Sequence, residues 1–225
     1  MRALTVMLCL ALVLSGIASA GMVATPTRMV YDEQSSAQTV AVKNSGTSAF
    51  LASATFEGKG TNHFTITPPL VRVDAGDKTL LRVRATNIAR LPTERESVFY
   101  YAITMIASGE KPGEQDSRVA VAARYWFKLF YRPSGIGHPE SGRCDLTFTR
   151  TADGLHAVNQ TPFYITLSSF VVDGQRVSLT PDTSMIAPRT SSLMSRTRKA
   201  SHVEWAWVND FGGTEDKCRF SFTDK

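Results

Sequence analysis

Residues 119–131 read Val-Ala-Val-Ala-Ala-Arg-Tyr-Trp-Phe-Lys-Leu-Phe-Tyr. Valine and aromatic side chains favour extended backbone, and successive side chains in a strand point to opposite faces. One face of such a strand would carry Val119, Val121, Ala123, Tyr125 and Phe127, and the other would carry Ala120, Ala122, Arg124, Trp126 and Lys128. This stretch therefore predicts one long β-strand.

Shorter apolar segments recur on both sides of this strand at intervals of about eight to twelve residues. Turn-forming clusters such as Asn44-Ser45-Gly46 and Glu57-Gly58-Lys59-Gly60 separate them. No stretch keeps a 3.6-residue apolar period over a helical length. The pattern predicts an all-β protein built from sandwiches, with further strands at residues 40–42, 50–56, 79–85, 98–106, 144–149, 155–158, 163–172, 177–179, 203–208 and 219–222.

The segment 132–142, Arg-Pro-Ser-Gly-Ile-Gly-His-Pro-Glu-Ser-Gly, follows the long strand. Its prolines and glycines cannot hold a strand ladder, so we expect a hinge there. The length on either side suits two domains of roughly 100 residues each. We predict an N-terminal domain at residues 21–134 and a C-terminal domain at residues 135–225.

Residues 1–20 have the pattern of an export signal. Arg2 precedes an apolar run from Leu4 to Ile17, and Ala18-Ser19-Ala20 matches the small residues at which signal peptidase cuts. The run is short for a membrane span, although a retained N-terminal anchor stays open as the alternative. No second run of this kind follows, so stable membrane insertion is not expected.

Two cysteines, Cys144 and Cys218, remain after the signal. An even pair in an exported protein indicates one disulfide. In the chain-entropy account, a bridge that closes the long loop between these two cysteines stabilises the fold by roughly 4 kcal/mol. The alternative, two reduced thiols buried independently, stays open.

Motifs for catalysis, metal binding or nucleic-acid binding are missing from the sequence. The histidines are far apart without ligand spacing, and no C-x-x-C pair, P-loop, G-x-G-x-x-G or G-x-S-x-G motif occurs. Basic residues exceed acidic ones only slightly and are scattered along the chain. We therefore expect no enzymatic activity, no cofactor, no metal and no nucleic-acid partner.

Several segments, taken together, resemble the PapD-like periplasmic chaperones of chaperone–usher pili. They are Pro26–Tyr31 (PTRMVY), Leu91–Tyr100 (LPTERESVFY), Phe127–Pro133 (FKLFYRP) and Asn209–Gly213 (NDFGG), with support from Asn159–Tyr164 (NQTPFY). The resemblance implies two immunoglobulin-like domains in a boomerang arrangement. It also implies a periplasmic chaperone that delivers pilus subunits to an outer-membrane usher by donor-strand complementation. An exported pilin or adhesin component is the alternative function, and self-association of the free chaperone stays open.

The resemblance also implies roles for individual residues. Arg28 and Lys128 would anchor the C-terminal carboxylate of the pilus subunit, although each could be an ordinary surface charge. Val119, Val121 and Ala123 would be the side chains that the donor strand inserts into the subunit. The alternative for such side chains is the chaperone's own core, and this is the interpretation we adopt for Tyr125 and Phe127.

Three further charged residues match the family's internal ion-pair network. They are Arg82, Glu96 and Asp210, and they would fix the angle between the domains. Losing one member of such a buried set leaves an unpaired charge. The segment Thr67-Pro68-Pro69 resembles a family segment with a cis proline, but the sequence leaves the isomer open.

Overall fold

The computed structural model describes residues 21–107, 122–140, 144–215 and 217–223. In these ranges the regular structure consists of strands and two short 3₁₀ helices, η1 (Gly58–Asn62) and η2 (Ser134–Ile136), so the all-β prediction is confirmed. Neither helix of this described part is long and apolar enough to span a membrane. The export signal and the donor positions Val119 and Val121 lie outside the described residues.

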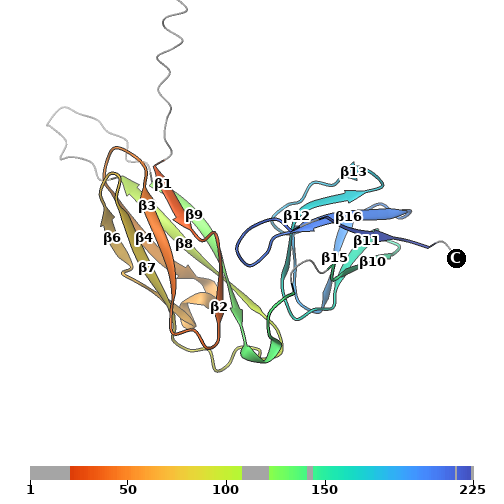
Figure 1. The fold of residues 1–225 in the computed structure, drawn as a ribbon, viewed down its shortest axis with the longest axis horizontal. Coiled ribbons are helices and arrows are strands. Elements are labelled where there is room, and N and C mark those ends of the chain that lie inside the picture. Colours follow the sequence, from red (N-terminus) through yellow and green to blue (C-terminus); the bar gives the residue numbers. More distant parts are fainter. Residues whose placement is uncertain (1–20, 108–121, 141–143, 216, 224–225) are drawn as a thin grey trace, which may run out of the picture.

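The N-terminal domain is a sandwich of two sheets (Figure 1). One sheet has four strands in the order β1-β3-β7-β5, which are β1 (Met22–Thr25), β3 (Gln38–Asn44), β7 (Lys78–Ala85) and β5 (Phe64–Thr67). The other has five strands in the order β2-β9-β8-β4-β6, which are β2 (Arg28–Asp32), β9 (Ala122–Arg132), β8 (Ser97–Ala107), β4 (Phe50–Glu57) and β6 (Leu70–Val73).

The chain changes sheets between β1 and β2. β1 pairs with β3 in the four-stranded sheet, whereas β2 pairs with β9 in the five-stranded sheet. The Thr25–Pro26 bond between them is cis, and so is the Thr67–Pro68 bond whose isomer the sequence left open. Because β1 and β2 pair in different sheets, the start of the domain contributes one edge strand to each sheet.

Aromatic side chains fill the space between the two sheets. The ring of Phe127 on β9 stacks on Tyr101 of β8 with 5.2 Å between centroids, and Phe64 contacts both Tyr31 and Phe99. Phe127 is therefore a core residue, as the sequence analysis expected. Tyr125 is not, because its side chain is 41% exposed. It pairs with Ile103 on β8, and it lies in the part of β9 that has no strand on its other side within the described residues.

The C-terminal domain is a second sandwich. One sheet has the order β10-β11-β15, which are β10 (Leu146–Arg150), β11 (Leu155–Asn159) and β15 (Thr190–Ser195). The other has the order β13-β12-β16-β17, with β14 also paired to β12; these are β13 (Gln175–Arg176), β12 (Ile165–Val172), β16 (His202–Trp207), β17 (Cys218–Ser221) and β14 (Met185–Ile186). The strand predicted at residues 177–179 is wrong, because those residues are outside any strand and the short strand β13 lies just before them.

A disulfide joins Cys144 to Cys218, as predicted. Cys144 lies just before β10, and Cys218 is the first residue of β17. These strands belong to different sheets of the C-terminal sandwich. The bridge therefore ties the two layers of this domain together near the beginning and the end of its chain.

The two sandwiches meet at an angle, with the ends of β8 and β9 and the helix η2 at the bend (Figure 1). This is the boomerang arrangement that the resemblance implied. Strand β9 runs through the N-terminal domain to the bend, and β12 begins on the opposite side of it. The space beside this bend holds the charged residues described next.

Candidate functional site

Arg28 and Lys128 are direct partners across the parallel pair of β2 and β9. Register partners on neighbouring strands share a face of the sheet. The Arg28 side chain points toward the C-terminal domain, where its Nη1 donates to Thr166 Oγ1 at 3.1 Å. Its guanidinium also lies over the Phe130 ring, 3.8 Å from the centroid. The fold thus brings the two predicted anchor residues together beside the bend.

Burial makes both of these cations costly to charge. Desolvation lowers the pKa of Arg28, and its carboxylate neighbours Glu96 and Asp210 only partly oppose that effect. Desolvation also lowers the pKa of the half-buried Lys128, and the nearby charge of Arg28 lowers it further. The buried Nε of Arg28 has no hydrogen-bond partner among the described residues. An anion bound between the two side chains would relieve the repulsion between them.

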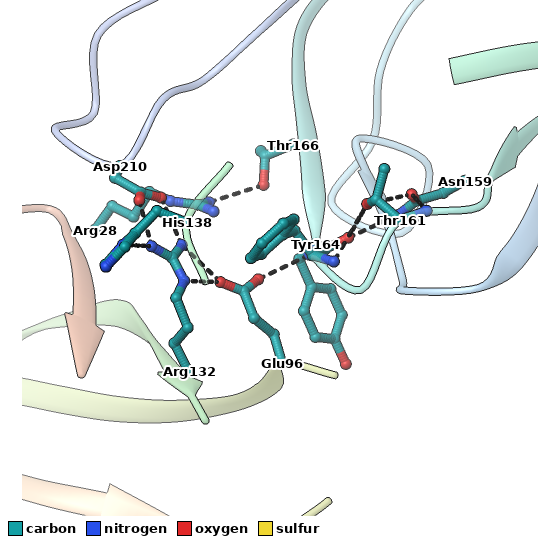
Figure 2. A network of polar contacts seen from close by, with 10 residues as sticks. Arg28, Glu96, Arg132, His138, Asn159, Thr161, Tyr164, Thr166 and Asp210 are labelled. Atoms are coloured by element: carbon teal, nitrogen blue, oxygen red, sulfur yellow. Dashed lines mark hydrogen bonds and ion pairs between the residues drawn. The ribbon is translucent and has the colours of Figure 1, made fainter. Parts of the chain in front are cut away.

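Arg132, at the end of β9, links the two domains. Its Nε and Nη2 donate to Glu96 Oε1 at 2.9 and 2.7 Å, while its Nη1 and Nη2 donate to Asp210 at 2.6 and 2.9 Å. Figure 2 shows the guanidinium between the two carboxylates, with Arg28 beside them. Its Nη1 also lies 3.2 Å from His138 Nδ1 in the hinge. Glu96 belongs to the N-terminal domain and Asp210 to the C-terminal domain, so this network crosses the bend.

The assignment of Arg82 to this network is wrong. Arg82 lies on β7 in the other sheet of the N-terminal domain, opposite Thr39, and is exposed. Its side chain points outward because its neighbours Leu81 and Val83 are fully buried on the inner face. Arg132 is the cation between Glu96 and Asp210. The two-residue alternation from Lys128 through Phe130 could have found it, since Arg132 continues that same face.

Glu96 makes three contacts that hold it at the domain boundary. Besides the Arg132 pair, its Oε2 accepts a hydrogen bond from the Tyr164 backbone N–H at 2.8 Å, and its own N–H donates to Pro162 O at 2.9 Å. Burial raises the pKa of Glu96, against the opposing effect of Arg132. Removing Arg132 would therefore leave a carboxylate in a place that disfavours its charge.

Strand β9 has an open edge. β2 covers only Lys128–Arg132, while β8 pairs with the whole of Ala122–Tyr131 from the other side. In the described part of the chain, no strand pairs with the β2 side of residues 122–127. An open edge of this kind is a template for another strand. Ala123, the one described donor position, lies in this stretch and is half-buried.

Both domains match one family of known proteins. Residues 21–137 match the pili and flagellar-assembly chaperone, PapD N-terminal domain, and residues 143–219 match the pili assembly chaperone PapD, C-terminal domain. The chain belongs to the PapD family. This PapD-family chain is accordingly a pilus assembly chaperone, and the alternative of a structural pilin or adhesin is not favoured.

Individual relatives agree with this assignment along most of the PapD-family chain. It is 34% identical to the chaperone protein FimB/FhaD of Bordetella pertussis, covering 89% of this chain and 88% of that protein. It is 32% identical to the chaperone protein LpfB of Salmonella typhimurium, covering 92% and 94%. The solved E. coli chaperone DraB is 28% identical with a TM-score of 0.74, covering 89% of this chain and 96% of that one.

The PapD family is a family of chaperones rather than of enzymes. The described residues contain no group of three or more histidine, cysteine or acidic side chains placed to hold a metal ion. The polar residues that the structure gathers are instead Arg28, Lys128 and the network around Arg132. Their arrangement suits binding and domain orientation.

Proposed function

We propose that this chaperone captures pilus subunits in the periplasm by holding their C-terminal carboxylate between Arg28 and Lys128. The observation that carries this proposal is the in-register pair itself, two cations on adjacent strands with lowered pKa values. A guanidinium can bind one carboxylate through two parallel hydrogen bonds, and an ammonium adds a second point of charge. If the last strand of a subunit lies beside β9, its C-terminal carboxylate is the group that reaches Arg28 and Lys128.

The open edge of β9 supplies the second part of the mechanism. An incoming subunit segment can add to residues 122–127 as a strand, with backbone hydrogen bonds as the general source of affinity. Side chains at Val119, Val121 and Ala123 would then enter the subunit and set the register. The carboxylate anchor lies at the inner end of this edge, so a segment held there would extend along β9 toward residue 119.

The remaining roles follow from the same mechanism. Glu96, Arg132 and Asp210 keep the two domains at a constant angle, so that the cleft keeps its shape before a subunit arrives. Residues 1–20 direct export to the periplasm, where the loaded chaperone delivers its subunit to an outer-membrane usher. No step of this process requires a catalytic residue, so no enzymatic activity is assigned.

Co-purification with a pilus subunit tests the anchor. The chaperone and a pilin encoded beside it are co-expressed, and the amount of pilin recovered per chaperone is measured for wild type, Arg28→Ala and Lys128→Ala. Both variants should remain folded and lose most of the recovered subunit. Arg82→Ala is the matched control, because it removes an exposed guanidinium from the other sheet. Normal recovery with both anchor variants would contradict the proposal.

A further inference from the structure

The outer face of the four-stranded sheet carries cations and no carboxylates. Alternate residues of β7 point outward there, and these are Lys78, Leu80, Arg82 and Arg84, all of them exposed. β3 adds Lys43 beside them, which is exposed as well. The four strands of this sheet contain no aspartate or glutamate. We call the four cations the basic face; none of them belongs to the proposed anchor or to the ion-pair network at the bend.

Strand register places two of these cations directly opposite each other. Lys43 and Lys78 are partners across the antiparallel pair of β3 and β7, and like charges in opposed positions destabilise a sheet. The cross-strand partners of Arg82 and Arg84 are threonines, which carry no charge. Within the described ranges, no carboxylate forms an ion pair with any member of the basic face. The face therefore presents an uncompensated positive charge to the surroundings.

Two exposed apolar side chains lie among these charges. Leu80 is 56% exposed and lies between Lys78 and Arg82 on the outer side of β7. Val23 on β1 is 48% exposed and is the cross-strand partner of Lys43, so it shares the same face of the sheet. Long cationic side chains together with exposed apolar ones are the combination with which a protein lies on an anionic lipid surface.

We propose that the basic face docks the chaperone on a bilayer that contains anionic phospholipids. Phosphate headgroups are mobile and can gather around the opposed pair of Lys43 and Lys78, whereas an acidic protein would need a carboxylate fixed opposite each cation. Leu80 and Val23 can enter the boundary between headgroups and acyl chains. The carboxylate anchor and the open edge of β9 belong to the other sheet of the sandwich, so this docking goes beyond the proposed function and does not depend on it.

Co-sedimentation with lipid vesicles tests this proposal. The chaperone, purified without residues 1–20, is mixed at low salt with phosphatidylcholine vesicles that contain either about 30% phosphatidylglycerol or none. It should bind only the anionic vesicles, and about 0.5 M salt should weaken this binding at least tenfold because salt screens the charges. The double variant Arg82→Gln with Arg84→Gln should bind about 25-fold more weakly, since each cation near an anionic surface accounts for about fivefold in affinity.

A matched double variant separates the basic face from net charge. Arg72→Gln with Arg124→Gln removes two exposed cations from the five-stranded sheet, where they pair with Asp74 and Glu57. This variant has the same net charge as the first and should bind anionic vesicles as the wild type does. Equal losses in the two double variants would show that only net charge matters and would overturn the proposal, as would a lack of binding to anionic vesicles.

Two further measurements separate lipid from protein as the occupant. Tighter binding to polyglutamate than to anionic vesicles at equal charge concentration would make an acidic protein the occupant and overturn the proposal. Recovery of a co-expressed pilin should be unchanged by Arg82→Gln with Arg84→Gln, because the anchor lies on the other sheet. A loss of recovery in that variant would assign the basic face to subunit capture and overturn its role in lipid docking, while leaving the anchor to its own test.

Discussion

At the scale of single residues, the site gathers several charged side chains in a partly buried space. Arg28 and Lys128 carry like charges on adjacent strands, and the two carboxylates nearby, Glu96 and Asp210, are both bonded to Arg132. The cluster of these three cations and two carboxylates therefore holds an excess positive charge. A bound carboxylate neutralises that excess, which explains why a chain end fits this place better than a neutral segment.

The pH dependence of binding should reveal Lys128. Its pKa in the free protein is lowered from an ordinary value of about 10.4, and a bound carboxylate should raise it again. Binding then takes up a proton once the pH exceeds the lowered pKa, so the affinity should be constant near pH 7 and fall as the pH rises toward 10. The measurement is the affinity for a peptide with a free C-terminal carboxylate at each pH.

Lys128→Arg provides the comparison for this pH series. A guanidinium stays protonated across that range, so the variant should keep its affinity at a pH where the wild type loses it. Identical pH profiles for the two proteins would show that the Lys128 charge takes no part in binding.

At the scale of single elements, β9 combines three tasks along its length. Its final residues pair with β2 and carry Lys128 and Arg132, its centre contributes Phe127 to the core, and its first described residues border the open edge. Because side chains alternate between faces, the strand can contribute to the core and to the cleft at once. Tyr125 lies between the core part and the open-edge part of the strand. It shares the face of Phe127 but is exposed, and it lies outside the stretch of β9 that pairs with β2.

Substitution at Val121 should distinguish donor side chains from core side chains. Val121→Asp places a charge where a subunit would bury a valine, and burial of one valine is worth roughly 1.5–3 kcal/mol. Capture of a co-expressed subunit should therefore fall about tenfold or more, while urea unfolding of the free chaperone stays unchanged.

The neighbouring position supplies a matched control for Val121. Ala122→Asp puts the same charge on the opposite, exposed face of the strand and should have little effect on capture. If Val121→Asp instead unfolds the free protein, Val121 belongs to the chaperone's own core.

At the scale of the whole molecule, the two sandwiches are joined by polar contacts that are largely withdrawn from water. The side chains of Arg132 and Glu96 are 2% and 0% exposed, and Asp210 completes the set from the other domain. Phe130 and Tyr164 add an aromatic contact across the same boundary, 5.6 Å between centroids. Such a set orients the domains because each group loses its partner if the angle changes.

Removing the central cation should loosen this junction. Arg132→Met leaves Glu96 buried without its partner and should lower the free energy of unfolding by about 3–5 kcal/mol. Urea unfolding measures that loss, and small-angle X-ray scattering should show a broader distribution of domain separations. Arg82→Met should change the free energy of unfolding by no more than about 0.5 kcal/mol, since surface substitutions usually do little. It should leave the distribution of domain separations unchanged. Equal effects of the two variants would argue against the network described above.

Much of the fold could be predicted from local sequence. The long strand at β9, the hinge after it and the pairing of Cys144 with Cys218 all follow from alternation, from turn-forming residues and from the parity of cysteines. Strands without such signals were missed: β15 reads Thr-Ser-Ser-Leu-Met-Ser and is mostly polar. Its neighbour β11 holds it in the sheet, and that pairing depends on a partner distant in the sequence.

The sequence by itself determined the fold class and the presence of two domains, and it predicted Arg28 and Lys128 as the anchor that we propose. Only the tertiary structure decided which cation joins Glu96 to Asp210, and which part of β9 has no strand on its β2 side among the described residues. Alternation along one strand depends on adjacent residues and can be seen in the sequence. Ion pairs between domains and the extent of an edge depend on how separate strands are aligned in space, which is why Arg132 rather than Arg82 fills the junction.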